Sequence, residues 1–148
     1  MTTRNRVDVI HGVNLDMLGR RPARHYGDLT FDQLEQQIGE FARELNLEAR
    51  FFQTNHEGEL VEHLHRLEGL ADAVVINPGA WTHYAWSIRD ALEIAGLPAV
   101  EVHLSDVDAR EDFRKVSVIR DHCFLTIKGQ GVEGYRAALT AIKEKLDL

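Results

Sequence analysis

The sequence predicts an α/β fold with a doubly wound parallel sheet. Short runs rich in Val, Ile and Phe alternate with longer stretches whose apolar residues follow the helical period. Polar residues come directly after four of these runs, in the segments 11–14, 53–57, 77–83 and 103–105. In open α/β sheets, ligands bind outside the carboxyl ends of the strands. These polar segments therefore predict a functional site along one edge of the sheet.

The first half of the chain predicts two strands and two helices. A strand over residues 7–11 is followed by a long loop over residues 12–29, and loops of this length in compact domains are often functional lids. Thr30 and Gln33 have the spacing of a capping box, so a helix begins there. The other elements are a strand over 48–54 and a helix over 58–68.

The second half continues the alternation. The strand over 73–76 is a continuous apolar run, as expected for a strand covered on both faces, and Pro78 ends it. The remaining elements are a helix over 82–95, a strand over 99–103, a short helix over 109–115, a strand over 124–128 and a helix over 132–146. This order predicts a flavodoxin-like, doubly wound, five-stranded parallel sheet, and residues 1–148 form a single domain.

Composition limits the classes of partner. The 148 residues are 44% hydrophobic, which suits one ordinary core, and the net charge is −7. Such an acidic chain is a poor match for nucleic acid or an anionic membrane, and no run reaches the roughly 20 apolar residues of a membrane span. Cys123 is the single cysteine, so the expected compartment is the cytoplasm, and its place before an apolar run suggests a structural thiol.

Arginine is concentrated in two places. Arg20, Arg21 and Arg24 lie in the long loop, and Arg110 and Arg114 follow the fourth strand. Arg binds carboxylates through paired hydrogen bonds in one plane. Two such clusters on an acidic protein predict a small anionic ligand.

Two segments carry candidate acid–base residues. Tyr26 follows the loop arginines, whose charge could favour its phenolate, although a loop Tyr is more often a packing residue. His103 ends the fourth strand, and Glu101 lies two residues earlier on the same side. A carboxylate that orients an imidazole suits a general acid, while the alternative is a hydrogen-bonded histidine at a strand end.

Other polar residues give weaker signals. Asn14, Asn77 and His83 flank strand ends, where each could equally be a turn or cap residue. His63 and His65 do not share a helix face, so a metal site is disfavoured. The Gly129-Gln-Gly131 sequence is interpreted as a tight turn before the last helix rather than a phosphate loop.

Together, these segments resemble the type II 3-dehydroquinate dehydratases, or type II dehydroquinases. The stretches that carry the resemblance are 12–19 with Tyr26-Gly27, 53–60, 76–83 with 89–92, 100–105 with 109–114, and 129–135. The resemblance implies removal of water from 3-dehydroquinate to give 3-dehydroshikimate, the third step of the shikimate pathway, with no metal or organic cofactor. It also implies trimers packed into a homododecamer.

The resemblance implies five catalytic residues. Tyr26 would take a C2 proton, with its phenolate favoured by Arg21, and a water held near Asn14 would stabilise the resulting enolate. His103, oriented by Glu101, would protonate the leaving C1 hydroxyl in an anti elimination.

It implies five substrate-binding residues as well. Asn77 would position the substrate and the catalytic histidine. Ser105 and the backbone at Leu104 would hold the substrate carboxylate, and His83 and Arg114 would contact ring hydroxyls. A structural or intersubunit role is expected for Arg110 and Asp90.

Five positions depart from the usual family pattern. His11 and Val13 stand where the family commonly has Asn and Pro, and Pro22 directly follows the loop arginine. Asp106 and Asp108 replace a frequent Asn and His, and a solvated loop face is expected for them. These changes bear on the lid and the rate more than on the reaction class.

Three alternatives belong to other classes. A non-catalytic flavodoxin-like binding module would keep the scaffold without turnover. A nucleotide-binding protein would need a Gly-x-Gly-x-x-Gly turn or a P-loop lysine, which the sequence lacks. A Schiff-base dehydratase would need a lysine such as Lys128 within a much longer barrel.

Overall fold

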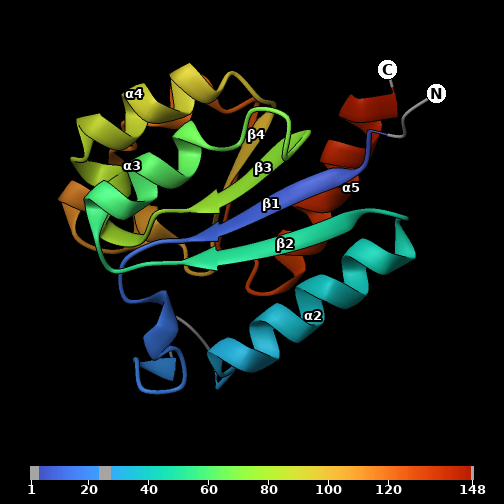
Figure 1. Ribbon diagram of the computed structural model, residues 1–148. Coiled ribbons are helices and arrows are strands. Elements are labelled where there is room, and N and C mark those ends of the chain that lie inside the picture. The colour runs from blue at the N-terminus through green and yellow to red at the C-terminus, as the bar shows by residue number, and fades with distance from the viewer. Residues whose placement is uncertain (1–3, 24–27, 148) are drawn as a thin grey trace.

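A five-stranded parallel sheet forms the centre of the molecule. The computed structural model describes residues 4–23 and 28–147. All strand pairs are parallel, in the order β2-β1-β3-β4-β5 (Figure 1). The strands are β1 (Arg6–His11), β2 (Glu48–Gln53), β3 (Ala73–Asn77), β4 (Ala99–His103) and β5 (Leu125–Lys128). The predicted fold class is therefore confirmed, and each strand begins and ends within one residue of its expected bounds.

Helices cover both faces of the sheet (Figure 1). One face packs against α2 (Phe31–Glu44) and α5 (Glu133–Asp147), and the other against α3 (Glu57–His65) and α4 (Trp86–Ala95). Each face has its own apolar core. Within residues 4–23 and 28–147, no helix combines the length and the apolar character that a membrane span requires.

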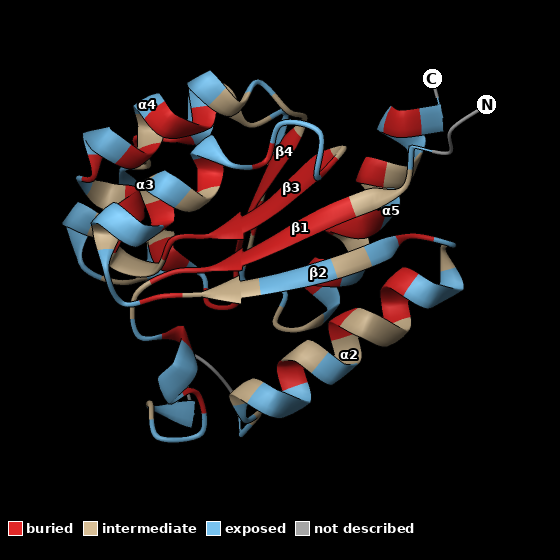
Figure 2. Cartoon of the chain, viewed as in Figure 1, coloured by how far each residue is buried: buried red, intermediate tan, exposed pale blue. Residues whose placement is uncertain are grey.

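Burial is greatest in the middle strands of the sheet. Every residue of β3 and β4 is buried, whereas β2 at the edge carries exposed and half-buried residues (Figure 2). The continuous apolar run in β3 thus has the two-sided cover that its sequence predicts. The polar residues at the ends of β3 and β4 are consequently held by well-packed strands.

The capping box at the start of α2 is present as predicted. The Gln33 backbone N–H donates to Thr30 Oγ1 at 3.2 Å, and the Thr30 backbone N–H donates to Gln33 Oε1 at 3.0 Å. These bonds satisfy two backbone donors at the helix N-terminus. They also end the long loop at a defined point, since α2 begins at Phe31.

The predicted helix over 82–95 is wrong in its first turn. The chain forms a 3-10 turn, η2 (Gly79–His83), and Tyr84 leaves the helical conformation, with φ −154° and ψ −6°, before α4 begins at Trp86. Thr82 does not cap a helix, because its hydroxyl bonds to Glu101 at 2.6 Å. The Thr82 hydroxyl thus makes a tertiary hydrogen bond to Glu101 in place of the local bond to a backbone N–H that a helix cap would make.

The predicted short helix over 109–115 is also wrong. Two 3-10 turns, η3 (Val107–Ala109) and η4 (Asp112–Lys115), are separated by an extended Arg110. The Asp106 side chain accepts from the Asp108 backbone N–H at 3.2 Å and so starts the first turn early. Another 3-10 turn, η1 (Leu15–Met17), interrupts the loop expected over 12–29, and a further one is η5 (Arg120–His122).

The segments after β1 and β3 lie in direct backbone contact. The Gly12 N–H donates to the Asn77 carbonyl at 2.7 Å, and a Cβ at Gly12 would lie 2.2 Å from the Pro78 carbonyl oxygen. A Cβ at Gly79 would lie 2.5 Å from the Val13 carbonyl oxygen. Only glycine permits these approaches, which join the two strand ends.

We therefore expect Gly12→Ala to destabilise the protein by about 3 kcal/mol, because the new methyl group would collide with backbone. Gly58→Ala is the matched control, since nothing lies within 4 Å of a Cβ there and the residue is in α3. That variant should be neutral or more stable by up to about 1 kcal/mol. Urea unfolding of both variants tests the contact, and equal midpoints would contradict it.

Candidate active site

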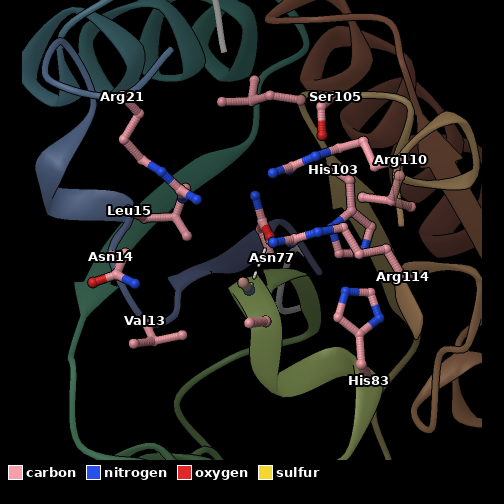
Figure 3. A pocket seen from close by; sticks show the side chains of 14 residues that line it. Val13, Asn14, Leu15, Arg21, Asn77, His83, His103, Ser105, Arg110 and Arg114 are labelled. Atoms are coloured by element: carbon pink, nitrogen blue, oxygen red, sulfur yellow. Dashed lines mark hydrogen bonds between the residues drawn. The ribbon is translucent and has the colours of Figure 1, made fainter. Parts of the chain in front are cut away.

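A cavity of about 130 Å³ opens where β1, β3 and β4 end. In the strand order β2-β1-β3-β4-β5, β2 lies on one side of β1 and all later strands lie on the other side. The direction in which strands are added to the sheet therefore reverses between β1 and β3. Ligands in doubly wound folds bind at this switch point. The cavity therefore lies where the polar strand ends predict a site (Figure 3).

Eight of the ten predicted site residues line the cavity. The N-terminal segment and the end of β3 contribute Asn14, Arg21, Asn77 and His83. The end of β4 and η4 contribute His103, Leu104, Ser105 and Arg114. The other two are Glu101, which lies beneath His103 with 1% exposure, and Tyr26, which lies outside the described residues.

Glu101 and His103 form a buried pair. His103 Nε2 lies 2.6 Å from Glu101 Oε2, and His103 is 6% exposed. An ionised carboxylate only accepts hydrogen bonds, so we assign the proton on Nε2 to this contact. Nδ1 is then the ring nitrogen left for a molecule in the cavity.

Two hydroxyl groups complete the environment of Glu101. Thr82 Oγ1 donates to Oε2 at 2.6 Å, and Ser117 Oγ donates to Oε1 at 2.7 Å. Burial by itself raises the pKa of Glu101, but the hydrogen bonds from His103, Thr82 and Ser117 together with the His103 charge lower it below its usual range. The carboxylate is therefore ionised. Sequence patterns gave no signal for Ser117, and suggested only a helix start for Thr82.

His83 faces the cavity as a neutral imidazole. Its Nδ1 lies 2.7 Å from the Val116 carbonyl oxygen, which fixes the proton on that nitrogen. Burial lowers the pKa of His83, and the positive charges of His103 and Arg114 lower it further. Its Nε2 can therefore accept a hydrogen bond from a ligand hydroxyl.

Three arginines make the cavity electropositive. Arg21 reaches in from the N-terminal loop, while Arg110 and Arg114 reach in from the opposite side (Figure 3). Arg114 is held by Glu111, with Nε to Oε2 at 2.5 Å, and lies over the Phe113 ring. A structural or intersubunit role was expected for Arg110, and the sequence did not predict that this residue lines the cavity. The arrangement suits a small anion, as the arginine clusters predict.

Asn14 is held by residues after β2. It adopts a left-handed conformation with φ 68°, and its backbone N–H donates to Asn55 Oδ1 at 2.8 Å. Asn55 also donates to Asp16, at 3.2 Å, and accepts from Gln53, at 3.2 Å. The polar residues after β2 thus support the cavity wall from behind.

The Gly129-Gln-Gly131 sequence forms the tight turn that was predicted. Gly129 and Gly131 have φ values of 75° and 58°, and their N–H groups donate to the carbonyls of Ser105 and Leu104 at 3.0 and 3.1 Å. These amides are used within the protein, which argues against a phosphate loop. The turn instead fixes the backbone that borders the cavity.

Comparison with known proteins decides the family. Residues 5–143 match the family model described as dehydroquinase class II. The chain is 48% identical over 142 residues to a 3-dehydroquinate dehydratase of Thermotoga petrophila, covering 96% of this chain and 97% of that one. The chain belongs to the class II dehydroquinase family.

Solved structures agree with this assignment. The type II dehydroquinase of Propionibacterium acnes superposes with a TM-score of 0.90 at 39% identity, over 97% of this chain and 98% of that one. The enzyme from Butyrivibrio crossotus gives a TM-score of 0.90 at 38% identity, over 99% and 100%. The resemblance and the enzyme class, a hydro-lyase family, are thereby confirmed.

The departures from the dehydroquinase pattern fall mostly outside the cavity. His11 is fully buried between Phe31 and Phe51 on the α2 side, with Nε2 3.3 Å from Glu35 Oε2. Asp106 is exposed, and Asp108 keeps 41% of its side-chain surface exposed while it pairs with Lys128, in line with the solvated loop face expected for them. Of the departing residues that the structure describes, Val13 lines the cavity.

Two further observations on this dehydroquinase family member concern its cysteine and its potential metal ligands. Burial, together with the charge of Glu101, raises the pKa of the partly buried Cys123 thiol to about 12, which agrees with a structural thiol. Across residues 4–23 and 28–147, no three His, Cys, Asp or Glu side chains are arranged to hold a metal ion.

We expect Glu101→Gln to lower the free energy of unfolding by about 1–3 kcal/mol at neutral pH, because an amide N–H₂ replaces an acceptor among three donors. The folded-state pKa of Glu101 lies below its usual 4.5. The ionised carboxylate therefore adds stability above that pH, and this contribution is lost as the pH falls through the folded-state pKa. The difference in the free energy of unfolding between the wild-type protein and the variant should therefore become smaller when urea unfolding is measured below pH 4.5.

Glu62→Gln is the control for this titration, since Glu62 is exposed and forms an ion pair with Arg66, which is exposed too. It should change stability by less than about 0.5 kcal/mol. A Glu101→Gln difference that stays constant from pH 7 to below 4.5 would contradict the ionised state of Glu101.

Proposed function

We propose that this protein converts 3-dehydroquinate to 3-dehydroshikimate by removing water, the third step of the shikimate pathway. The observation that carries the proposal is the His103–Glu101 pair, with 2.6 Å between Nε2 and Oε2, beside a cavity lined by three arginines. The pair supplies an oriented proton donor, and the arginines supply charge complementary to a carboxylate substrate. Family membership and relatives named 3-dehydroquinate dehydratase support the same substrate.

The proposed reaction is an anti elimination through an enolate. Tyr26, as a phenolate favoured by Arg21, removes a proton from C2, and the electron pair is held in the enolate. When that pair forms the C1–C2 double bond, the C1–O bond breaks and the leaving hydroxyl takes a proton from His103 to become water. Glu101 stabilises the imidazolium before transfer, since its carboxylate is ionised and 2.6 Å away.

Other cavity residues bind and orient the substrate in this scheme. The backbone at Leu104 and the Ser105 hydroxyl hold the carboxylate, and the electropositive cavity wall favours it. His83 accepts a hydrogen bond from a ring hydroxyl through Nε2, because Val116 occupies Nδ1. Asn77 positions the ring, and its Oδ1 is already fixed by the Gly79 N–H at 3.0 Å.

Asn14 would hold the water that stabilises the enolate. Its left-handed backbone is fixed by the hydrogen bond from its N–H to Asn55 Oδ1, which limits the directions that the side chain can take. A donor aimed at the developing negative charge lowers the barrier most when it is fixed in advance. Asn55 therefore supports the enolate step indirectly.

Two further features stay predictions. The homododecamer, a tetramer of trimers, is tested by light scattering on the purified protein, where a mass near twelve times the 16.8 kDa chain is expected. A cytoplasmic location, expected from the single cysteine, is tested by fractionating cells that express the protein.

The first experiment adds the purified protein, with a chelator and no cofactor, to 3-dehydroquinate. We expect the ultraviolet absorbance of a conjugated enone to appear, because elimination creates a double bond next to the carbonyl. A flat trace from folded protein, beside a working dehydroquinase control, would contradict the proposed function. Tight substrate binding without turnover would then favour the non-catalytic binding module.

His103→Gln and Tyr26→Phe should each lower kcat by at least about 100-fold, the usual minimum for loss of a general acid or base. His65→Gln is the matched control for the first variant, because His65 is exposed at the end of α3. Substrate binding should persist in both catalytic variants and is measured by titration calorimetry. Full activity of either variant would remove that residue from the proposed mechanism.

A further inference from the structure

Residues 116–118 cross the site between η4 and η5, and we call them the strap. Each strap residue makes a hydrogen bond to a different part of the site. The bonds are His83 Nδ1 to the Val116 carbonyl at 2.7 Å, Ser117 Oγ to Glu101 Oε1 at 2.7 Å, and the Val118 N–H to the Thr82 carbonyl at 2.7 Å. The strap therefore joins η2 to the interior of β4.

Ser117 contacts the carboxylate oxygen that His103 does not use. Oε2 of Glu101 accepts from both His103 Nε2 and Thr82 Oγ1, each at 2.6 Å, whereas Oε1 accepts from Ser117. The terminal torsion of a Glu side chain has a broad energy minimum, so a carboxylate held at one oxygen can still turn. Donors on both oxygens fix its plane.

We propose that Ser117 is a positioning residue for proton transfer from His103. By fixing the plane of the Glu101 carboxylate, Ser117 fixes the direction of the Nε2–H bond and so presents Nδ1 to the cavity. The inference rests on the proposed function, because it takes His103 as the acid of the elimination. Ser117 itself does not line the cavity.

The strap also gives the two histidines opposite roles. The Val116 carbonyl accepts a hydrogen bond from Nδ1 of His83, so the Nε2 of His83 is free of a proton and can act as an acceptor. One residue later, Ser117 donates to the carboxylate that accepts the hydrogen bond from His103 Nε2. The strap thus specifies which nitrogen of each ring faces the cavity.

The kinetic test compares Ser117→Ala with Ser117→Thr. Loss of the hydroxyl should lower kcat about tenfold and leave KM within about twofold, because binding groups are untouched while the acid is misaligned. Ser117→Thr keeps a hydroxyl and should retain most of the activity. Ser87→Ala is the matched control, since Ser87 donates to Glu57 at 2.9 Å on the surface, and it should match the wild-type enzyme.

A second measurement does not depend on turnover. With ¹⁵N-labelled histidine, the wild-type protein should show a strongly downfield His103 Nε2–H proton, because that nitrogen donates to Glu101. Ser117→Ala should shift that proton upfield, while Ser87→Ala should leave it unchanged. If Ser117→Ala fails to fold, Ser117→Cys, with a similar shape and a weak donor, provides the same comparison.

The outcomes separate this inference from the proposed function. An inactive wild-type protein would overturn the proposed function, and the NMR comparison would still decide whether Ser117 orients His103. An active wild-type enzyme with an equally active Ser117→Ala variant would overturn the positioning role. A Ser117→Ala variant whose loss lies in KM alone would overturn it too, because that result assigns Ser117 to substrate binding.

Discussion

Glu101 places a carboxylate on β4 in the interior of the molecule, with 1% of its surface exposed. Burying such a charge without partners costs several kcal/mol, so the surrounding structure must bring donors to it. One donor, His103, comes from the same strand, and the others come from η2 and from the segment after η4. Satisfying this single charge therefore ties η2 and residue Ser117 to the interior of β4.

A second constraint acts at the ends of β1 and β3. Gly12 and Gly79 let two backbones approach to distances that no side chain would allow. This contact brings Asn14 and Asn77 to one wall of the cavity, while the arginines approach from loops on either side. The result is a cavity lined by three arginines in a chain of net charge −7, so positive charge for an anionic ligand is concentrated at this place.

Local patterns explain why much of the fold and site could be predicted from the sequence. Apolar runs that end in polar residues specify the strands, and alternation along β4 puts Glu101 and His103 on one side. The contacts of Thr82 and Ser117 with Glu101 span 19 and 16 residues, and they depend on how loops cross the sheet. No local pattern contains that information. The same tertiary bond to Thr82 explains the misplaced start of α4.

The inertness of the Cys123 thiol affects how the protein can be handled and labelled. Because burial raises the pKa of this thiol to about 12, very little of the reactive thiolate form is present at pH 7. Solutions kept in air should therefore resist disulfide-linked pairing of chains. Conversely, alkylation of this thiol would occur mainly when the segment leading into β5 opens to water, so the labelling rate would report the frequency of that local opening near Glu101.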